Sequence, residues 1–195
     1  MVSWLGAHAL EILGVIFSIA YLIFSIRQNI LLWPLGIASA LCYMVVFFQS
    51  KFYADMGLNG YYVVISIYGW ILWKKGSGES GTGLAVSRLG KRQALILFLI
   101  TALAFAGIGV ILDRFTDSPV PYWDAFTTAL SFTATWMLAR KILENWILWI
   151  IVDAVSMALY LYRGLYPTLL LFAIYTTMAV IGYLKWKQSY KSGVQ

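Results

Sequence analysis

The sequence contains little charge, one cysteine and one histidine. Charged residues make up 11% of the 195 residues and hydrophobic residues 62%. In soluble domains about 25% of the residues are charged and about 45–50% are apolar. So few polar side chains cannot cover a surface in water, and the composition predicts an integral membrane protein. Cys42 has no second cysteine for a disulfide or a cysteine-based zinc site, and His8 alone excludes a bis-histidine haem or an HExxH site. We therefore expect no metal and no cofactor.

Motifs for catalysis and for nucleotide hydrolysis are missing as well. The segment Gly76–Gly83 (GSGESGTG) has no lysine after its glycines, so we interpret it as a flexible linker and not as a phosphate-binding loop. His8 has no serine or cysteine partner that the sequence identifies, which argues against a catalytic triad. The net charge of +6 does not indicate nucleic-acid binding, because the basic residues lie between apolar runs. The N-terminal apolar stretch lacks the basic region of a cleavable signal peptide. An enzyme is not expected, nor is ATP-driven transport by this chain alone.

What the sequence does contain is a series of apolar runs of membrane-spanning length. A spanning helix needs roughly 17–25 mostly apolar residues. The sequence predicts seven, at Ala9–Ile26, Leu31–Gln49, Asp55–Trp73, Gln93–Leu112, Trp123–Leu138, Trp146–Leu161 and Tyr166–Lys185. If they alternate across the membrane, 11 of the 14 Lys and Arg residues fall on one side. The positive-inside rule then places the C-terminus in the cytoplasm and the N-terminus outside.

Two stretches of the chain resemble each other and predict an internal repeat. At a spacing of 116, Asn29, Leu32, Trp33 and Ala38 match Asn145, Leu148, Trp149 and Ala154; at a spacing of 113, Tyr53, Leu58, Tyr62, Gly69, Trp73 and Lys74 match Tyr166, Leu171, Tyr175, Gly182, Trp186 and Lys187. We therefore predict an all-α membrane fold, a parallel 3+1+3 repeat of seven helices. Residues 1–75 form the first repeat, 76–112 a cytoplasmic loop and connector helix, and 113–195 the second repeat. Parallel repeats are typical of transporters that bind substrate near the midplane, although interfacial Trp and Tyr and close packing at Gly offer an alternative explanation.

The sharpest candidate site is the motif Asn145-Trp146-x-x-Trp149-x-x-x-Asp153. Trp146, Trp149 and Asp153 are spaced i, i+3, i+7 and share one helix face. A carboxylate roughly 10–12 Å inside a helix start is costly in lipid, so Asp153 should face the bundle interior or a cavity. Indole rings beside a carboxylate suit a flat, cationic ring. The alternative places the tryptophans in the interfacial belt and bonds Asp153 to a neighbouring helix.

Other polar residues of the predicted helices could line the path of a solute. The candidates on the third and fifth spans form stripes at helical spacing, and Gln49 lies at the outer end of the second span. These candidates are Asn59, Tyr62, Asp124, Thr128, Ser131 and Gln49. The same stripes could instead hydrogen-bond across packed helices. Glu11, near the outer surface, is a weaker candidate for a gate.

Three motifs together resemble those of a known family. The segments Asn145–Asp153 (NWILWIIVD), Tyr122–Asp124 (YWD) and Ile67–Trp73 (IYGWILW) resemble the PnuC-type vitamin transporters, and the resemblance extends from the first span to the last. It implies a fold similar to the SWEET sugar transporters and a homotrimer embedded in lipid. It also implies facilitated diffusion of an unphosphorylated vitamin across a bacterial inner membrane, with trapping by a cytosolic kinase.

The resemblance also bears on the substrate. Many nicotinamide riboside transporters of this family have Asn at the position of Asp153, and the Asp and the short chain here resemble the thiamine-transporting branch. We therefore expect thiamine, with nicotinamide riboside as the alternative, since both are cations. The expected mechanism is rocking of the two repeats around Trp149 and Asp153, without a coupling ion. A substrate-capture subunit that does not transport by itself and a sugar porter are the rival functions.

Overall fold

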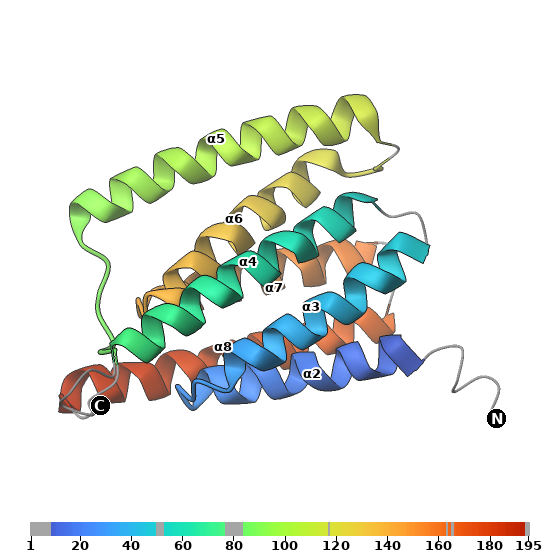
Figure 1. The fold of residues 1–195 in the computed structure, drawn as a ribbon. Helices are drawn as coiled ribbons and strands as arrows, with labels where there is room; N and C mark the ends of the chain where they lie inside the picture. The colour runs from blue at the N-terminus through green and yellow to red at the C-terminus, as the bar shows by residue number, and fades with distance from the viewer. Residues whose placement is uncertain are drawn as a thin grey trace. The chain divides into compact units, whose positions relative to one another are not determined.

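Seven α-helices account for nearly all of the residues that the structure describes. The computed structural model describes residues 9–49, 53–76, 84–116, 118–162, 164 and 166–193. Its helices are α2 (Ala9–Ile26), α3 (Leu32–Gln49), α4 (Tyr53–Lys75), α5 (Lys91–Phe115), α6 (Pro121–Ala139), α7 (Asn145–Tyr162) and α8 (Tyr166–Ser192) (Figure 1). The prediction of seven helices is confirmed. His8, residues 77–83 of the predicted linker and the side chains of Glu11 and Asp55 lie outside the described residues.

The predicted boundaries agree with the observed helices to within three residues, except at one end. α8 continues to Ser192, whereas the predicted span stops at Lys185. The difference arises because an apolar run ends at the first lysine, but a helix can continue past it into water. By length and composition, α3, α5, α7 and the segment Thr168–Ser192 of α8 are apolar enough to cross a membrane.

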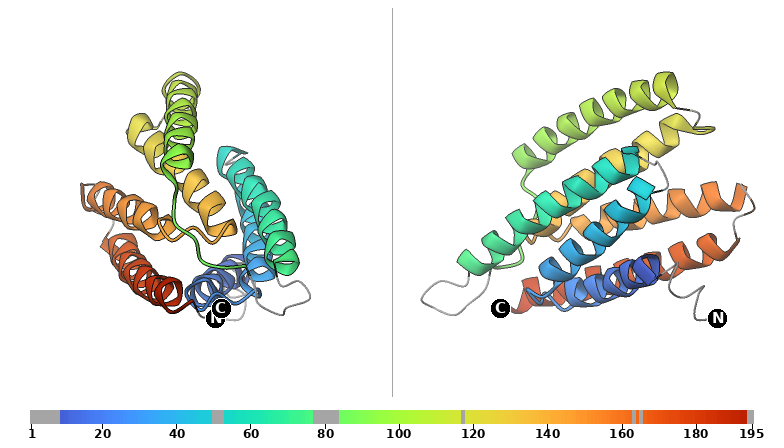
Figure 2. Two further views of the ribbon diagram at one scale, coloured as in Figure 1. Left: turned by 90° about the vertical axis from the view of Figure 1, so that its left-hand side faces the viewer. Right: turned by 45° about the vertical axis from the view of Figure 1, so that its right-hand side comes forward.

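The chain divides into two compact units, and the division falls between Ala85 and Val86. In the first unit α3 packs against both α2 and α4. In the second unit α5 packs against α6, α6 against α7 and α7 against α8, as the two views of Figure 2 show. α5, which was predicted as a separate connector, lies in the second unit. It is joined to α6 by a hydrogen bond of 2.6 Å between the hydroxyls of Thr101 and Thr133.

The turn between α2 and α3 has the same backbone design as the turn between α6 and α7. Gln28 and Lys141 have positive φ, of 55° and 51°. In each turn this residue donates its N–H to the carbonyl three residues back, and the next residue donates to the carbonyl five residues back. The bonds run from Gln28 to Ser25 (3.1 Å) and Asn29 to Phe24 (2.9 Å), and from Lys141 to Leu138 and Ile142 to Met137 (both 2.9 Å). This is the Schellman ending of a helix, in which a left-handed residue satisfies the last carbonyls. Each pair of equivalent residues is 113 apart in the sequence.

A tryptophan pair closes the two helices that follow each turn. In each unit a buried Trp lies over a Gly of the next helix and meets a second buried Trp edge to face. The sets are Trp33, Gly69 and Trp73 in the first unit (ring centroids 5.4 Å apart, 88°) and Trp146, Gly182 and Trp186 in the second (5.6 Å, 84°). The second set again lies 113 residues after the first.

These contacts correct the predicted spacing at the start of α3 and α7. The sequence matched Trp33 with Trp149 at a spacing of 116, but the packing matches Trp33 with Trp146 at 113. The first-unit position equivalent to Trp149 is Gly36, where an added Cβ would meet the ring of Tyr21 at 2.9 Å. An aromatic ring on α2 thus fills the space that a large residue at position 36 would need.

The corrected spacing also gives Asp153 a new counterpart. At a spacing of 113 the counterpart is Ala40, whereas the spacing of 116 gives Ile37. Both are apolar, so the shared helix packing does not require an acid. Trp149 and Asp153 are therefore particular to the second unit, whereas Trp146 belongs to a packing motif that both units share.

We expect Gly182→Ala to destabilise the protein. An ideal Cβ at this position would lie 2.7 Å from three ring atoms of Trp146, and the buried indole has little room to move. Overpacking of this kind costs about 1–3 kcal/mol. The check is the midpoint of thermal unfolding in detergent, with Gly60→Ala on α4 as the control because nothing lies within 4 Å of its Cβ. Equal midpoints for the two variants would contradict the close packing.

Candidate functional site

The candidate site is built on the inward face of α7. Buried residues recur at helical spacing along this helix: Asn145, Trp146, Val152, Asp153 and Ser156. Trp149 lies on the same side and is half-buried. This periodicity confines the polar groups of α7 to one stripe, as expected for a helix whose opposite face meets lipid.

Asp153 is the most unusual residue of this stripe. Its side chain is 5% exposed, and within the described residues its carboxylate has no hydrogen bond or ion pair from the protein. Tyr175 lies on α8, the helix that packs against α7. A buried charge without a partner is costly. Such a group fits a cation that is brought by a ligand.

Trp146 and Trp149 have different surroundings. Trp146 is 1% exposed, and its ring is enclosed by Gly182 and Trp186. Trp149 is half-buried and has no counterpart in the first unit, where Gly36 takes its position. The geometry therefore favours a packing role for Trp146 and leaves Trp149 as the indole of α7 that can stack on a ligand one helical turn from Asp153.

Asn145 closes the turn that leads into α7. Its side-chain Nδ2 donates to the Ile142 carbonyl at 2.7 Å, and the residue is fully buried. Its Oδ1 has no hydrogen-bond partner within the described residues. Asn145 thus holds the start of the helix with one end of its amide, and the other end presents an unused acceptor.

The α6 candidates have local partners. The Ser118 hydroxyl donates to the Asp124 carboxylate at 2.5 Å, which ties Asp124 to the loop before the helix. The Ser131 hydroxyl donates to the Thr127 carbonyl at 2.8 Å, and Thr128 is half-buried. Both hydrogen bonds are local to α6 and the loop before it, and neither crosses to another helix as the alternative supposed.

The remaining predicted candidates belong to the first unit. Asn59 on α4 is buried, Tyr62 one turn later is half-buried, and Gln49 at the end of α3 is exposed. These three residues belong to the first unit, and α7 belongs to the second. The ring of Tyr62 lies beside that of Tyr61, with the ring centroids 5.8 Å apart.

Sequence reasoning did not assign Tyr175 to the site. It entered only as the repeat partner of Tyr62, because no motif joins α8 to Asp153. A phenol in the middle of an apolar helix, 113 residues after another candidate, was the signal that could have identified it.

The sequence is similar to those of known membrane transporters. A model of the family described as nicotinamide mononucleotide transporter matches residues 8–188. The chain belongs to this family. The nicotinamide riboside transporter PnuC of Escherichia coli K12 is 25% identical over 178 residues, which cover 79% of this chain and 74% of that protein. The riboflavin/roseoflavin transporter RibM of Streptomyces davaonensis is 23% identical over 201 residues, covering 94% and 92%.

The fold has also been seen before. The crystal structure of the vitamin B3 transporter PnuC superposes with a TM-score of 0.74 at 24% identity, covering 95% of this chain and 83% of that one. Family and fold together identify the chain as a multi-pass membrane transporter and not an enzyme, as the sequence predicted. The PnuC-type resemblance is confirmed.

Proposed function

We propose that the chain is a facilitator that carries a small cationic vitamin across a bacterial inner membrane, with nicotinamide riboside as the first candidate. The family and the substrate of the PnuC relative support this choice over the thiamine expected from the sequence. The observation that carries the proposal is the buried Asp153, which has no hydrogen bond or ion pair within the described residues and lies one turn from the half-buried Trp149. The positively charged pyridinium ring of nicotinamide riboside can stack on the indole while its charge is balanced by the carboxylate.

Transport in this proposal runs down the concentration gradient. The sequence contains no motif for nucleotide hydrolysis, and nothing in it indicates a site for a coupling ion. A site that alternates between the two sides then only equilibrates the solute, because a ligand that binds both states equally shifts neither. Net uptake requires a cytosolic kinase that phosphorylates the vitamin. The cytoplasmic C-terminus and the homotrimer are parts of the same proposal.

Thiamine is the second candidate, and one observation favours it. Asp153 is a carboxylate, and thiamine combines a thiazolium cation with an exocyclic amine that can donate to such a group. Riboflavin, the ligand named for the RibM relative, carries no permanent charge. A buried carboxylate therefore favours either cation over riboflavin.

The test is direct binding of the three vitamins to the purified protein in detergent. We expect nicotinamide riboside and thiamine to bind at least about tenfold more tightly than riboflavin, a difference of about 1.4 kcal/mol. Asp153→Asn should narrow that gap, because it removes the charge and keeps the shape. Tightest binding of thiamine would transfer the assignment to the second candidate. Riboflavin binding equal to both cations would refute the role given to Asp153.

A further inference from the structure

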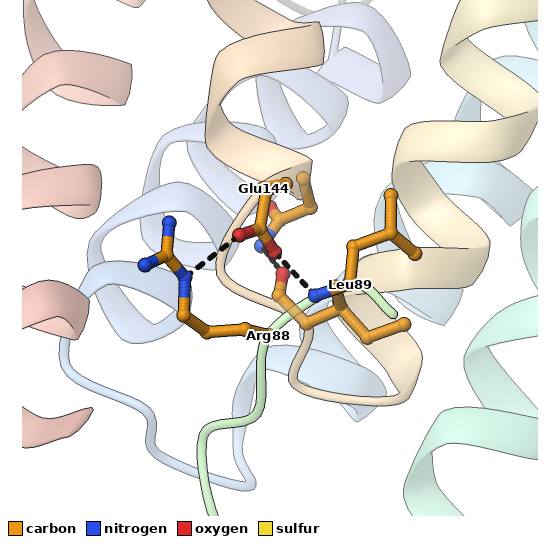
Figure 3. A network of polar contacts seen from close by, with 5 residues as sticks. Arg88, Leu89 and Glu144 are labelled. Carbon is orange, nitrogen blue, oxygen red and sulfur yellow. Dashed lines mark hydrogen bonds and ion pairs between the residues drawn. The ribbon is translucent and has the colours of Figure 1, made fainter. Parts of the chain in front are cut away.

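The segment that precedes α5 is fastened to the turn that precedes α7 within the second unit. Ser87 donates its N–H to the Lys141 carbonyl and accepts the N–H of Leu143, both at 2.9 Å. Glu144 completes the attachment, since its carboxylate accepts the Leu89 N–H at 2.9 Å and the Arg88 Nε at 3.1 Å (Figure 3). We name this set of contacts the linker clasp.

The linker clasp is partly enclosed by apolar side chains. Ile142 and Leu143 are 3% and 1% exposed, and Val86 at the start of the segment is 9% exposed. The Glu144 side chain is 20% exposed, whereas that of Arg88 is 58% exposed. Water therefore weakens the exposed ion pair with Arg88 more than it weakens the less exposed hydrogen bond to the Leu89 amide. Glu144 is the central member of the clasp.

The turn itself does not need the clasp. The turn between α2 and α3 makes the same backbone hydrogen bonds. At 113 residues before Glu144 it has Leu31, which is 50% exposed and has no side-chain acceptor. That turn is capped from within, by the Asn29 Oδ1 that accepts the Leu31 N–H at 2.9 Å. The clasp is thus an addition to the turn in front of the helix that carries the candidate site.

The position of the first residue of α7 determines where Trp149 and Asp153 lie, because the helix joins them. Glu144 directly precedes the helix, and Asn145 and Trp146 next to it are fully buried. At 1.5 Å per residue, Asp153 lies about 13 Å along the helix axis from Glu144. A helix is stiff over this length, so a displacement of its start displaces Trp149 and Asp153 as well.

We propose that Glu144 is a positioning residue for vitamin binding. By holding Ser87–Leu89 against the start of α7, it fixes the depth and rotation at which Trp149 and Asp153 are presented. Glu144 itself does not touch the vitamin. The inference rests on the proposed function in one respect, namely that Trp149 and Asp153 contact the substrate.

Two measurements on full-length protein test the proposal: hydrogen–deuterium exchange of the amides of residues 145–153, and the Kd for nicotinamide riboside and for thiamine. In Glu144→Ala we expect faster exchange in these turns and a Kd about tenfold weaker, the effect of losing a hydrogen bond to a charged group. Glu144→Gln should recover most of both, because its amide oxygen can still accept the Leu89 N–H. Asp113→Ala, which removes an exposed carboxylate from α5, is the matched control and should match wild type.

A second variant guards against poor folding of Glu144→Ala. Arg88→Glu changes an exposed residue and sets a like charge against Glu144, so it should loosen the clasp and weaken binding several-fold. Wild-type exchange in both variants would overturn the proposal, and so would faster exchange with an unchanged Kd. If wild-type protein binds neither vitamin, the proposed function fails. In that case the exchange measurement alone decides whether Glu144 holds α7.

Discussion

Asp153→Ala is expected to abolish vitamin transport while leaving the protein at least as stable as wild type. The carboxylate is buried and, within the described residues, has no hydrogen bond or ion pair, so its removal breaks no such contact there and relieves an uncompensated charge. For substrate binding, by contrast, we expect Asp153→Ala to be unfavourable. Truncating one partner of a buried charge pair costs about 2–5 kcal/mol, at least roughly thirtyfold in affinity.

Two measurements separate these effects: uptake into liposomes and the midpoint of thermal unfolding in detergent. Asp124→Ala is the matched control, because Asp124 is a second acid of the second unit whose partner is the Ser118 hydroxyl. It should retain uptake and lose some stability, since it leaves that hydroxyl without its acceptor. Wild-type uptake by Asp153→Ala, or a large drop in its unfolding midpoint, would show that the acid is structural.

The two tryptophans of α7 should fail in different ways when truncated. Trp146→Ala removes a fully buried ring from its contact with Gly182 and Trp186. Core Trp→Ala changes cost about 3–5 kcal/mol, so most of this variant should be unfolded or aggregated after extraction. Trp149→Ala removes a half-buried ring that lies one turn from Asp153. It should fold, and its loss of aromatic stacking should weaken vitamin binding by about 1 kcal/mol or more.

Trp149→Phe is the conservative control, since a smaller aromatic ring keeps part of the stacking and should recover part of the affinity. Trp33→Ala in the first unit extends the comparison, because the equivalent ring should cost as much stability as Trp146. If Trp149→Ala lost stability and Trp146→Ala lost only binding, the assignment of roles would be reversed.

The helices could be predicted from the sequence because the membrane imposes a simple rule of length and hydropathy. The seven predicted spans correspond to the seven helices of the described residues, and the largest error, at the end of α8, lies where lysines follow an apolar run. The register of the repeat could not be predicted as reliably. Two tryptophans three residues apart, Trp146 and Trp149, both offer a match for Trp33, and the true match depends on contacts with α8.

The candidate site was predicted in part. Asp153 stood out because a carboxylate within an apolar helix is costly in lipid, and its burial, without a hydrogen bond or ion pair among the described residues, agrees with that reasoning. The local role of Asp124 depends on Ser118, a hydrogen bond that spacing alone does not reveal. Glu144 was missed for a related reason, since its hydrogen bonds join segments far apart in the chain.

Flux into liposomes that contain only the purified protein tests the central claim most directly. Labelled nicotinamide riboside and labelled thiamine would be added outside, with and without a trapped cognate kinase and ATP. We expect one or both cations to equilibrate without an energy source, to accumulate only with the kinase, and to enter neither protein-free liposomes nor those with Asp153→Ala. Tight binding without flux of either vitamin would contradict it and would identify the chain as a substrate-capture subunit.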